Sequence, residues 1–303
     1  MNLAPIVLFT YNRPWHTRQT IEALQKNHFA SESELFILSD APKTEKDEPR
    51  VREVREYLKT IKGFKKIEII ERDKNWGLAN NIIDGVTKIV NEYGKIIVLE
   101  DDLVTSPYFL KYMNEGLEIY KEEERVASIH GYVPPLPNPE KLPETFFLKG
   151  ADCWGWATWK RAWDYFEPDG KKLFTLLKER GECYKFDYNG SYPYTKMLKD
   201  QIKGKNNSWA IRWYASAFLN DMLTLYPRKS LVKNIGLDYS GTHCGSTKIF
   251  NVEITYEDII LKKVPIEVNK EALKQFEIYY KSSLSGSKTF LKKILSILKG
   301  RIS

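Results

Sequence analysis

The stretch Lys95-Ile-Ile-Val-Leu-Glu-Asp-Asp-Leu103 decides the fold prediction for this chain. Its apolar, largely β-branched first half predicts a short buried strand. That strand runs directly into three consecutive carboxylates, Glu100, Asp101 and Asp102. Because unpaired carboxylates are costly to bury, the cluster indicates a bound cation, and hard oxygen ligands suit Mn²⁺ or Mg²⁺. A solvated acidic turn after a core strand is the open alternative.

The residues before this strand alternate between short apolar runs and amphipathic segments. The pattern predicts three earlier strands, over residues 5–10, 34–40 and 66–70, with helices between them. Four strands joined by helices predict an α/β fold with a Rossmann-like, mostly parallel sheet flanked by helices. Such sheets bind ligands at the carboxyl ends of their strands, where the acidic triplet falls. No GxGxxG motif or Walker lysine is present, so neither a dinucleotide fold nor a P-loop is indicated.

Beyond Ser106 the alternation stops and aromatic residues become dense. Residues 150–163 contain four tryptophans, which fit either a helix buried on several sides or, as the interspersed Asp152 and Lys160 favour, the wall of a cleft. A second aromatic helix is expected over residues 209–218. The polar loop 238–245 carries glycines that would give it the freedom of a mobile lid.

Composition limits the classes of protein that fit. The 303 residues are 42% hydrophobic and 13% aromatic, which indicates a globular chain. Three widely spaced cysteines suggest neither a disulfide framework nor a zinc site and fit a reducing compartment. We expect no signal peptide and no transmembrane helix. The net charge is +7, but the basic residues are spread along the chain and interleaved with acidic ones, so we expect no nucleic-acid partner.

Four motifs in order resemble a known family. They are a strand followed by Thr10-Tyr-Asn-Arg-Pro14, a strand followed by Ser39-Asp40, then Asn75-Trp-Gly-Leu-Ala-Asn-Asn81, then Val98-Leu-Glu-Asp-Asp-Leu103. This order is similar to GT-A-fold glycosyltransferases, both family 2 enzymes and the N-acetylglucosaminyltransferase I group, in which a Glu-Asp-Asp triplet replaces Asp-X-Asp. The resemblance covers about residues 3–250. It implies an inverting, metal-dependent hexosyl- or N-acetylhexosaminyl-transferase that uses a nucleotide diphosphosugar, foremost a UDP-sugar.

The resemblance also implies roles for individual residues. It places Asp102 on Mn²⁺ or Mg²⁺, Arg13 near the nucleotide or the diphosphate, Asp40 at the base, and Glu100 near the donor sugar. The full set that it assigns to nucleotide-sugar binding is Thr10, Arg13, Asp40, Asn81, Glu100, Asp101 and His243, the last in a loop that folds over the phosphates.

The general base is not found where the family places it. An inverting transfer needs a group that accepts the proton of the acceptor hydroxyl. The family has a carboxylate beside a tryptophan near the start of the second aromatic helix, but this chain reads Lys205-Asn-Asn-Ser-Trp209 there. Asp200 and Asp152 are the remaining candidates for a catalytic base. A non-catalytic sugar-binding protein derived from such an enzyme therefore stays an alternative, and a nucleotidyltransferase is a second one.

The C-terminal end differs in character from the rest of the chain. We expect a GT-A domain over residues 1–280, with a nucleotide-sugar half at about 1–106 and an aromatic-rich acceptor half at about 107–280. Residues 281–303 are expected to be a small-residue linker and a basic amphipathic helix, since residues 288–303 contain no acidic residue and place their apolar side chains on one stripe. That pattern is typical of a helix in the membrane interface. We therefore expect a cytoplasmic protein, peripheral on the inner face of the membrane, with a glycan or lipid-linked acceptor from surface polysaccharide synthesis.

Overall fold

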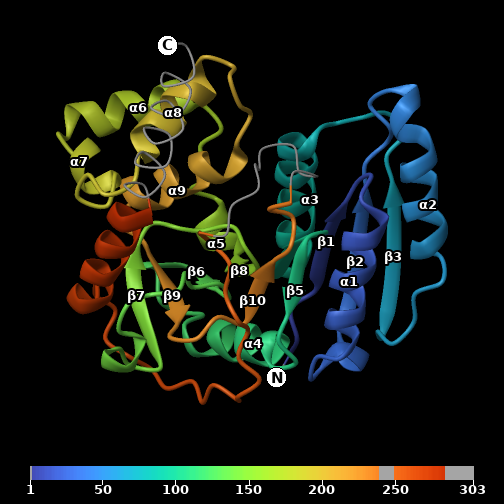
Figure 1. Cartoon of the computed structure of the whole chain (residues 1–303), viewed down its shortest axis with the longest axis horizontal. Helices are drawn as coiled ribbons and strands as arrows, with labels where there is room; N and C mark the ends of the chain where they lie inside the picture. The colour runs from blue at the N-terminus through green and yellow to red at the C-terminus, as the bar shows by residue number, and fades with distance from the viewer. Residues whose placement is uncertain (1, 239–248, 284–303) are drawn as a thin grey trace, which may run out of the picture.

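The fold is organised around one mixed sheet. The computed structural model of the chain describes residues 2–238 and 249–283. Eight strands lie in the order β3-β2-β1-β4-β8-β6-β9-β7, and β8 and β7 run opposite to the other six. Helices cover both faces of this sheet (Figure 1). The predicted α/β fold with a mostly parallel sheet is confirmed.

The first 106 residues make the parallel half of the sheet. β1 is its central strand, and its neighbours β2 and β4 pair with it in parallel. The elements of this half are β1 (Ile6–Thr10), α1 (Pro14–Gln25), η1 (Ala30–Glu32), β2 (Glu34–Ser39), η2 (Glu45–Asp47), α2 (Glu48–Leu58), β3 (Lys66–Glu71), α3 (Leu78–Tyr93) and β4 (Lys95–Glu100). The short strand β5 (Leu103–Thr105) follows and pairs in antiparallel fashion with residues 232–234 in a separate two-stranded sheet.

The second half adds four strands that the sequence analysis did not expect as part of the sheet. β8 joins β4 in antiparallel pairing, and β6, β9 and β7 follow outward. The elements here are α4 (Phe109–Ile119), β6 (Val126–His130), η3 (Pro139–Lys141), β7 (Thr145–Lys149), β8 (Trp156–Trp159), α5 (Lys160–Trp163), α6 (Gly170–Glu179), α7 (Cys183–Phe186), α8 (Tyr194–Ile202), α9 (Trp209–Leu219), β9 (Leu223–Pro227) and β10 (Val232–Asn234). One continuous sheet therefore runs through both predicted halves.

β1 shows why both faces of the sheet are apolar. All five of its residues are buried, and alternate side chains enter opposite cores because successive residues of a strand point to opposite faces. Ile6 and Leu8 pack in the core that includes Leu24 of α1, whereas Val7 and Phe9 pack in the core that includes residues of α3. A near-continuous apolar run is what a central parallel strand requires.

The tryptophan-rich segment is mainly core, so the favoured cleft-wall interpretation was wrong for most of it. Trp156, Trp159 and Trp163 are no more than 5% exposed. The segment is also not a single helix, because Trp156–Trp159 form β8 and only Lys160–Trp163 are helical. Trp156 stacks on Trp209 of the aromatic helix α9, with ring centroids 5.5 Å apart. Tertiary contact between these segments, which the sequence could not show, buries the rings.

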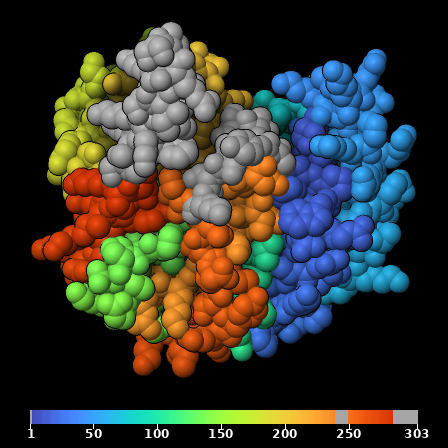
Figure 2. All heavy atoms as spheres, in the orientation of Figure 1, coloured from blue at the N-terminus to red at the C-terminus, as the bar shows by residue number. Residues whose placement is uncertain are grey.

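The C-terminal described residues return to the sheet. Residues 270–283 are helical, so the helix continues past the expected boundary at 280, and the tail prediction for residues 284–303 lies outside the described residues. In Figure 2 the N-terminal residues, in blue, occupy one side of the visible face, and the orange and red segments lie across its middle and on the other side, beside green and yellow-green segments. Among the described helices, none combines the length and the apolar character needed to cross a membrane.

Candidate functional site

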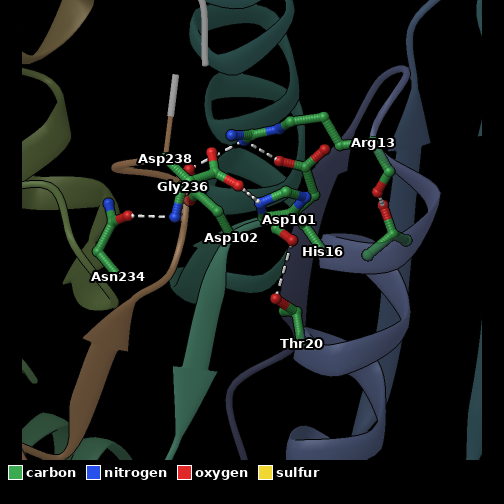
Figure 3. A network of polar contacts seen from close by, with 9 residues as sticks. Arg13, His16, Thr20, Asp101, Asp102, Asn234, Gly236 and Asp238 are labelled. Atoms are coloured by element: carbon green, nitrogen blue, oxygen red, sulfur yellow. Dashed lines mark hydrogen bonds and ion pairs between the residues drawn. The ribbon is translucent and has the colours of Figure 1, made fainter. Parts of the chain in front are cut away.

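The acidic triplet lies at the carboxyl edge of the parallel strands and faces Arg13. Glu100 ends β4 beside Phe9 of β1, and Arg13 directly precedes α1. The Arg13 guanidinium donates through Nη2 to Asp102 Oδ2 at 2.9 Å and also pairs with Asp101 Oδ1 (Figure 3). Asp101 and Asp102 are 4% and 7% exposed. The alternative of a solvated acidic turn is thereby excluded, because Asp101 and Asp102 are buried and paired with Arg13.

The electrostatics of this cluster favour positive charge. Burial lowers the pKa of Arg13, but the charges of Asp101 and then Asp102 outweigh burial and raise its pKa above the ordinary value. One guanidinium faces three acidic side chains, so a further cation would reduce the remaining repulsion. The site is thus suited to binding a second positive charge.

Glu100 shows the repulsion directly. Burial, followed by the charges of Asp102 and Asp101, raises the pKa of Glu100 to about 8. Its side chain is therefore largely protonated at neutral pH in the protein alone. A cation placed beside the triplet would favour the ionised form, because an opposite charge stabilises a carboxylate.

Helix α1 presents one polar face to the triplet. The Thr20 hydroxyl donates to the Asp101 carbonyl oxygen at 2.9 Å, and the Thr17 hydroxyl donates to the Arg13 carbonyl oxygen at 2.9 Å. His16 Nε2 lies 3.1 Å from Asp238 Oδ2. Asp238 directly precedes residues 239–248 in the chain. His16 was not among the predicted site residues. The sequence could have indicated His16 through its spacing, because it lies three residues after Arg13 and four before Thr20, and positions so spaced share one face of a helix.

The segment after β10 covers the other side of the triplet, and sequence reasoning missed it. Ile235 donates its backbone N–H to the Asp102 carbonyl oxygen at 2.9 Å, and the Gly236 N–H is held by Asn234 Oδ1 at 2.8 Å. A Cβ at Gly236 would overlap Asp102 Oδ2 and lie 2.7 Å from Arg13 Nη1. Only glycine allows the backbone to approach the ion pair this closely. The predicted site residue His243 lies outside the described residues.

Asp40 is a buried organiser of the loop before α3. Its Oδ1 accepts backbone N–H groups from Ala41 and Trp76, each at 2.9 Å, and its Oδ2 accepts the N–H of Gly77 at 2.9 Å. The Asn75 amide adds a contact to Oδ2 at 3.2 Å. Asp40 thus holds the loop before α3 in place. Its predicted contact with a nucleotide base stays a prediction.

Two other predicted residues lie along the same edge. Thr10 ends β1, is 3% exposed, and its hydroxyl has no hydrogen-bond partner within the described part of the chain. Asn81 on α3 accepts a hydrogen bond from Arg72 Nε at 2.9 Å, and the Arg72 guanidinium lies 4.0 Å from the centroid of the Trp76 ring. Arg72 was not predicted. A buried hydroxyl without a partner marks a place where a ligand atom could bind.

The two candidate bases are in different surroundings. Asp152 precedes β8, whose first residue Trp156 pairs in antiparallel fashion with Val98 near the carboxyl end of β4, so Asp152 lies towards the edge of the sheet that carries the triplet. Asp200 is on α8 and pairs with Lys196, and Lys205 Nζ is 3.9 Å away. The hydrogen bond from Lys196 lowers the pKa of Asp200. This geometry favours Asp152, because a base must lie near the reacting groups.

The first part of the chain, which contains this site, matches the model of a known protein family. Residues 6–133 match the family model described as Glycosyl transferase family 2. The predicted resemblance to family 2 glycosyltransferases is confirmed. The match includes β1, the acidic triplet and β6, and it ends before the tryptophan-rich segment. No curated protein matches the sequence. The more detailed resemblance to the N-acetylglucosaminyltransferase I group stays a prediction.

Solved structures with partial likeness include two complexes with nucleotide sugars. The 1–349 fragment of S. aureus TarS in complex with UDP-GlcNAc is 12% identical, with a TM-score of 0.41 over 76% of this chain and 58% of that chain. The mannosyltransferase PcManGT from Pyrobaculum calidifontis, in complex with GDP-Man and Mn²⁺, is 8% identical, with a TM-score of 0.39 over 73% of this chain and 70% of that chain. The chain therefore spans less than two thirds of the TarS fragment.

The residues present fit a divalent cation in one particular manner. Among residues 2–238 and 249–283, no group of three or more His, Cys, Asp or Glu side chains is arranged to hold a metal. Mg²⁺-like ions are commonly held by one or two carboxylates together with substrate phosphates and water. The negative charge around Asp102 fits that arrangement, in which the donor supplies the missing oxygen ligands.

We expect Glu100→Gln to change how stability depends on pH. The folded protein favours protonated Glu100, because its pKa of about 8 exceeds the ordinary value of 4.5. Stability that is fully present below pH 4.5 should therefore be lost as the pH rises towards 8 in the wild type but not in the variant. Urea unfolding without added metal should show a relative loss of about 1 kcal/mol or more between pH 5 and 8.

The control for this prediction is Glu53→Gln, since Glu53 is exposed on α2. That variant should keep the pH dependence of the wild type. Parallel stability curves for the wild type and Glu100→Gln would contradict the assignment of a raised pKa to Glu100.

Proposed function

We propose that this chain is an inverting glycosyltransferase that moves a sugar from a nucleotide diphosphosugar to a hydroxyl of a glycan or lipid-linked acceptor. The observation that carries the proposal is the buried Arg13–Asp101–Asp102 cluster at the carboxyl edge of β1 and β4, within the residues that match family 2. A UDP-sugar is the proposed donor. The proposed setting is surface polysaccharide synthesis.

In the proposed reaction the chain's own groups hold the leaving diphosphate. Asp102 would hold Mn²⁺ or Mg²⁺, which supplies positive charge to the oxygens of the nucleoside diphosphate. Arg13 lies against the same carboxylates and can donate to a phosphate oxygen in two parallel hydrogen bonds. These groups act where negative charge develops, and such stabilisation is commonly the largest contribution to catalysis.

Asp152 is the proposed general base. It would accept the proton of the acceptor hydroxyl while that oxygen forms a bond to the anomeric carbon. The bond between that carbon and the diphosphate oxygen breaks on the opposite face, and its electron pair leaves with the nucleoside diphosphate. Support comes from the position of Asp152 just before β8, whose first residue Trp156 pairs with Val98 near the end of β4, where the triplet begins.

Asp102→Asn should lower the rate of sugar transfer by about 10²-fold or more, since it removes a charged ligand but keeps the side-chain shape. Transfer from UDP-sugars with Mn²⁺ present is the measurement, with circular dichroism as the check on folding. Asp164→Asn is the matched control, because Asp164 is exposed and pairs only with Lys160 among its described salt bridges. Unchanged turnover in Asp102→Asn would exclude the proposed metal role.

Asp152→Asn should slow transfer by about 10²- to 10⁴-fold while donor affinity stays near that of the wild type, as is typical for loss of a general base. Asp200→Asn should transfer sugar at close to the normal rate, because Asp200 is held by lysines on the surface of α8. Single-turnover kinetics and calorimetric titration with the donor separate the two quantities. The opposite ranking of the two variants would assign the base to Asp200.

We also propose that residues 288–303 bind the chain to the inner face of the membrane. The support is the sequence pattern of basic residues without acidic ones beside an apolar stripe. A lipid-linked acceptor would be presented at that surface.

Deletion of residues 286–303 should abolish binding to liposomes that contain anionic lipid, whereas the full chain should bind and should release as salt rises. Co-sedimentation over a salt series measures this, and transfer to a water-soluble acceptor shows that the truncated chain is folded. Equal partitioning of the truncated and full-length chains would exclude a role for the tail in membrane binding.

A further inference from the structure

A buried histidine lies behind the proposed base. His130 ends β6, and its register partner Trp156 on β8 also pairs with Val98 of β4. β6 runs in the same direction as β4, so His130 reaches the same edge of the sheet as the acidic triplet. His130 Nε2 lies 3.5 Å from Asp152 Oδ2.

The imidazole of His130 has no hydrogen bond in the described part of the chain. The residue is 0% exposed, and neither Nδ1 nor Nε2 has a partner there. Leaving a buried polar group unpaired costs about 1–3 kcal/mol, so such groups in native proteins call for an explanation. Packing alone does not supply one, because an apolar side chain would fill this position without that cost.

Burial also determines the protonation state of His130. It lowers the pKa of the imidazole, and the charge of Asp152 opposes this less strongly. The Tyr226 ring packs on the imidazole with centroids 5.2 Å apart, and the Tyr132 ring lies at 6.3 Å. A neutral imidazole keeps one N–H donor and one acceptor. A neutral His130 can therefore donate a hydrogen bond to Asp152, while Asp152 remains the group that accepts the proton of the acceptor hydroxyl.

The other titratable groups around Asp152 stay neutral near pH 7. Burial raises the pKa of the Cys153 thiol and of the tyrosines that experience the Asp152 charge. Among the described residues, His130 is the one Lys, Arg or His side chain within 4 Å of the carboxylate. The tyrosines are Tyr132, Tyr188, Tyr194, Tyr214, Tyr226 and Tyr280.

We propose that His130 is a positioning residue that donates from Nε2–H to Asp152 Oδ2 and holds this carboxylate oriented towards the acceptor. The inference rests on the proposed function of Asp152 as the base. Asp152 Oδ1 is already fixed by the Cys153 N–H at 2.8 Å, so a second donor at Oδ2 would define the plane of the carboxylate. The present separation needs to shorten by about half an ångström, and catalytic hydrogen bonds commonly tighten when substrate binds.

The test compares two amide replacements in the full-length chain. His130→Gln places an amide nitrogen near the position of Nε2, whereas His130→Asn places it near Nδ1, too short to reach Asp152. Both variants keep a polar side chain, and thermal unfolding shows whether each folds. The first measurement is the ¹³C chemical shift of the Asp152 carboxyl carbon at a fixed pH, with Asp152→Asn used to assign the signal.

His130→Asn should change this chemical shift and should lower kcat for transfer by about 10- to 100-fold with donor KM unchanged, since the carboxylate loses a donor that orients it. His130→Gln should stay close to the wild type in both measurements. Equal chemical shifts in the wild type and both variants would overturn the proposal. A wild-type chain that transfers no sugar would instead refute the proposed function, and the chemical shift would still decide whether His130 acts on Asp152.

Discussion

The ion pair between Arg13 and the carboxylates of Asp101 and Asp102 is the interaction around which the site is arranged. Buried charges are tolerated only when they are paired and hydrogen-bonded, so this cluster constrains every element that touches it. β1 and β4 must be neighbours to bring the two sides together, and α1 must begin directly after Arg13. The backbone after β10 must approach closely enough that only Gly236 fits.

The same ion pair explains why the site can accept a further positive charge. Arg13 partly neutralises the triplet, yet Glu100 still has its pKa raised to about 8, first by burial and then by its acidic neighbours. In the proposed reaction a divalent ion and the donor diphosphate enter together. Arg13 can then share its hydrogen bonds with phosphate oxygens, and the ionised triplet gains a stronger counter-charge.

The second half of the chain supports the site from the opposite side of β4. β8 pairs with β4 in antiparallel fashion, so the loop that begins β8 lies beside the end of β4. The buried rings of Trp156 and Trp209 fix that loop by stacking between strand and helix. In the proposed reaction the donor is held by the parallel half, and the acceptor's proton is taken at Asp152, on the joining edge.

The sequence by itself determined the parallel half of the fold and the chemistry of its edge. Apolar runs that end in polar residues, as at Thr10, Asp40 and Glu100, identify buried parallel strands and their carboxyl ends, because both signals are local in the chain. Tertiary structure alone decided what those carboxylates touch. The cover by Gly236, the facing of His130 and Asp152, and the burial of the tryptophans all depend on contacts between segments far apart in sequence, and no local pattern encodes which distant backbone will come within hydrogen-bond reach.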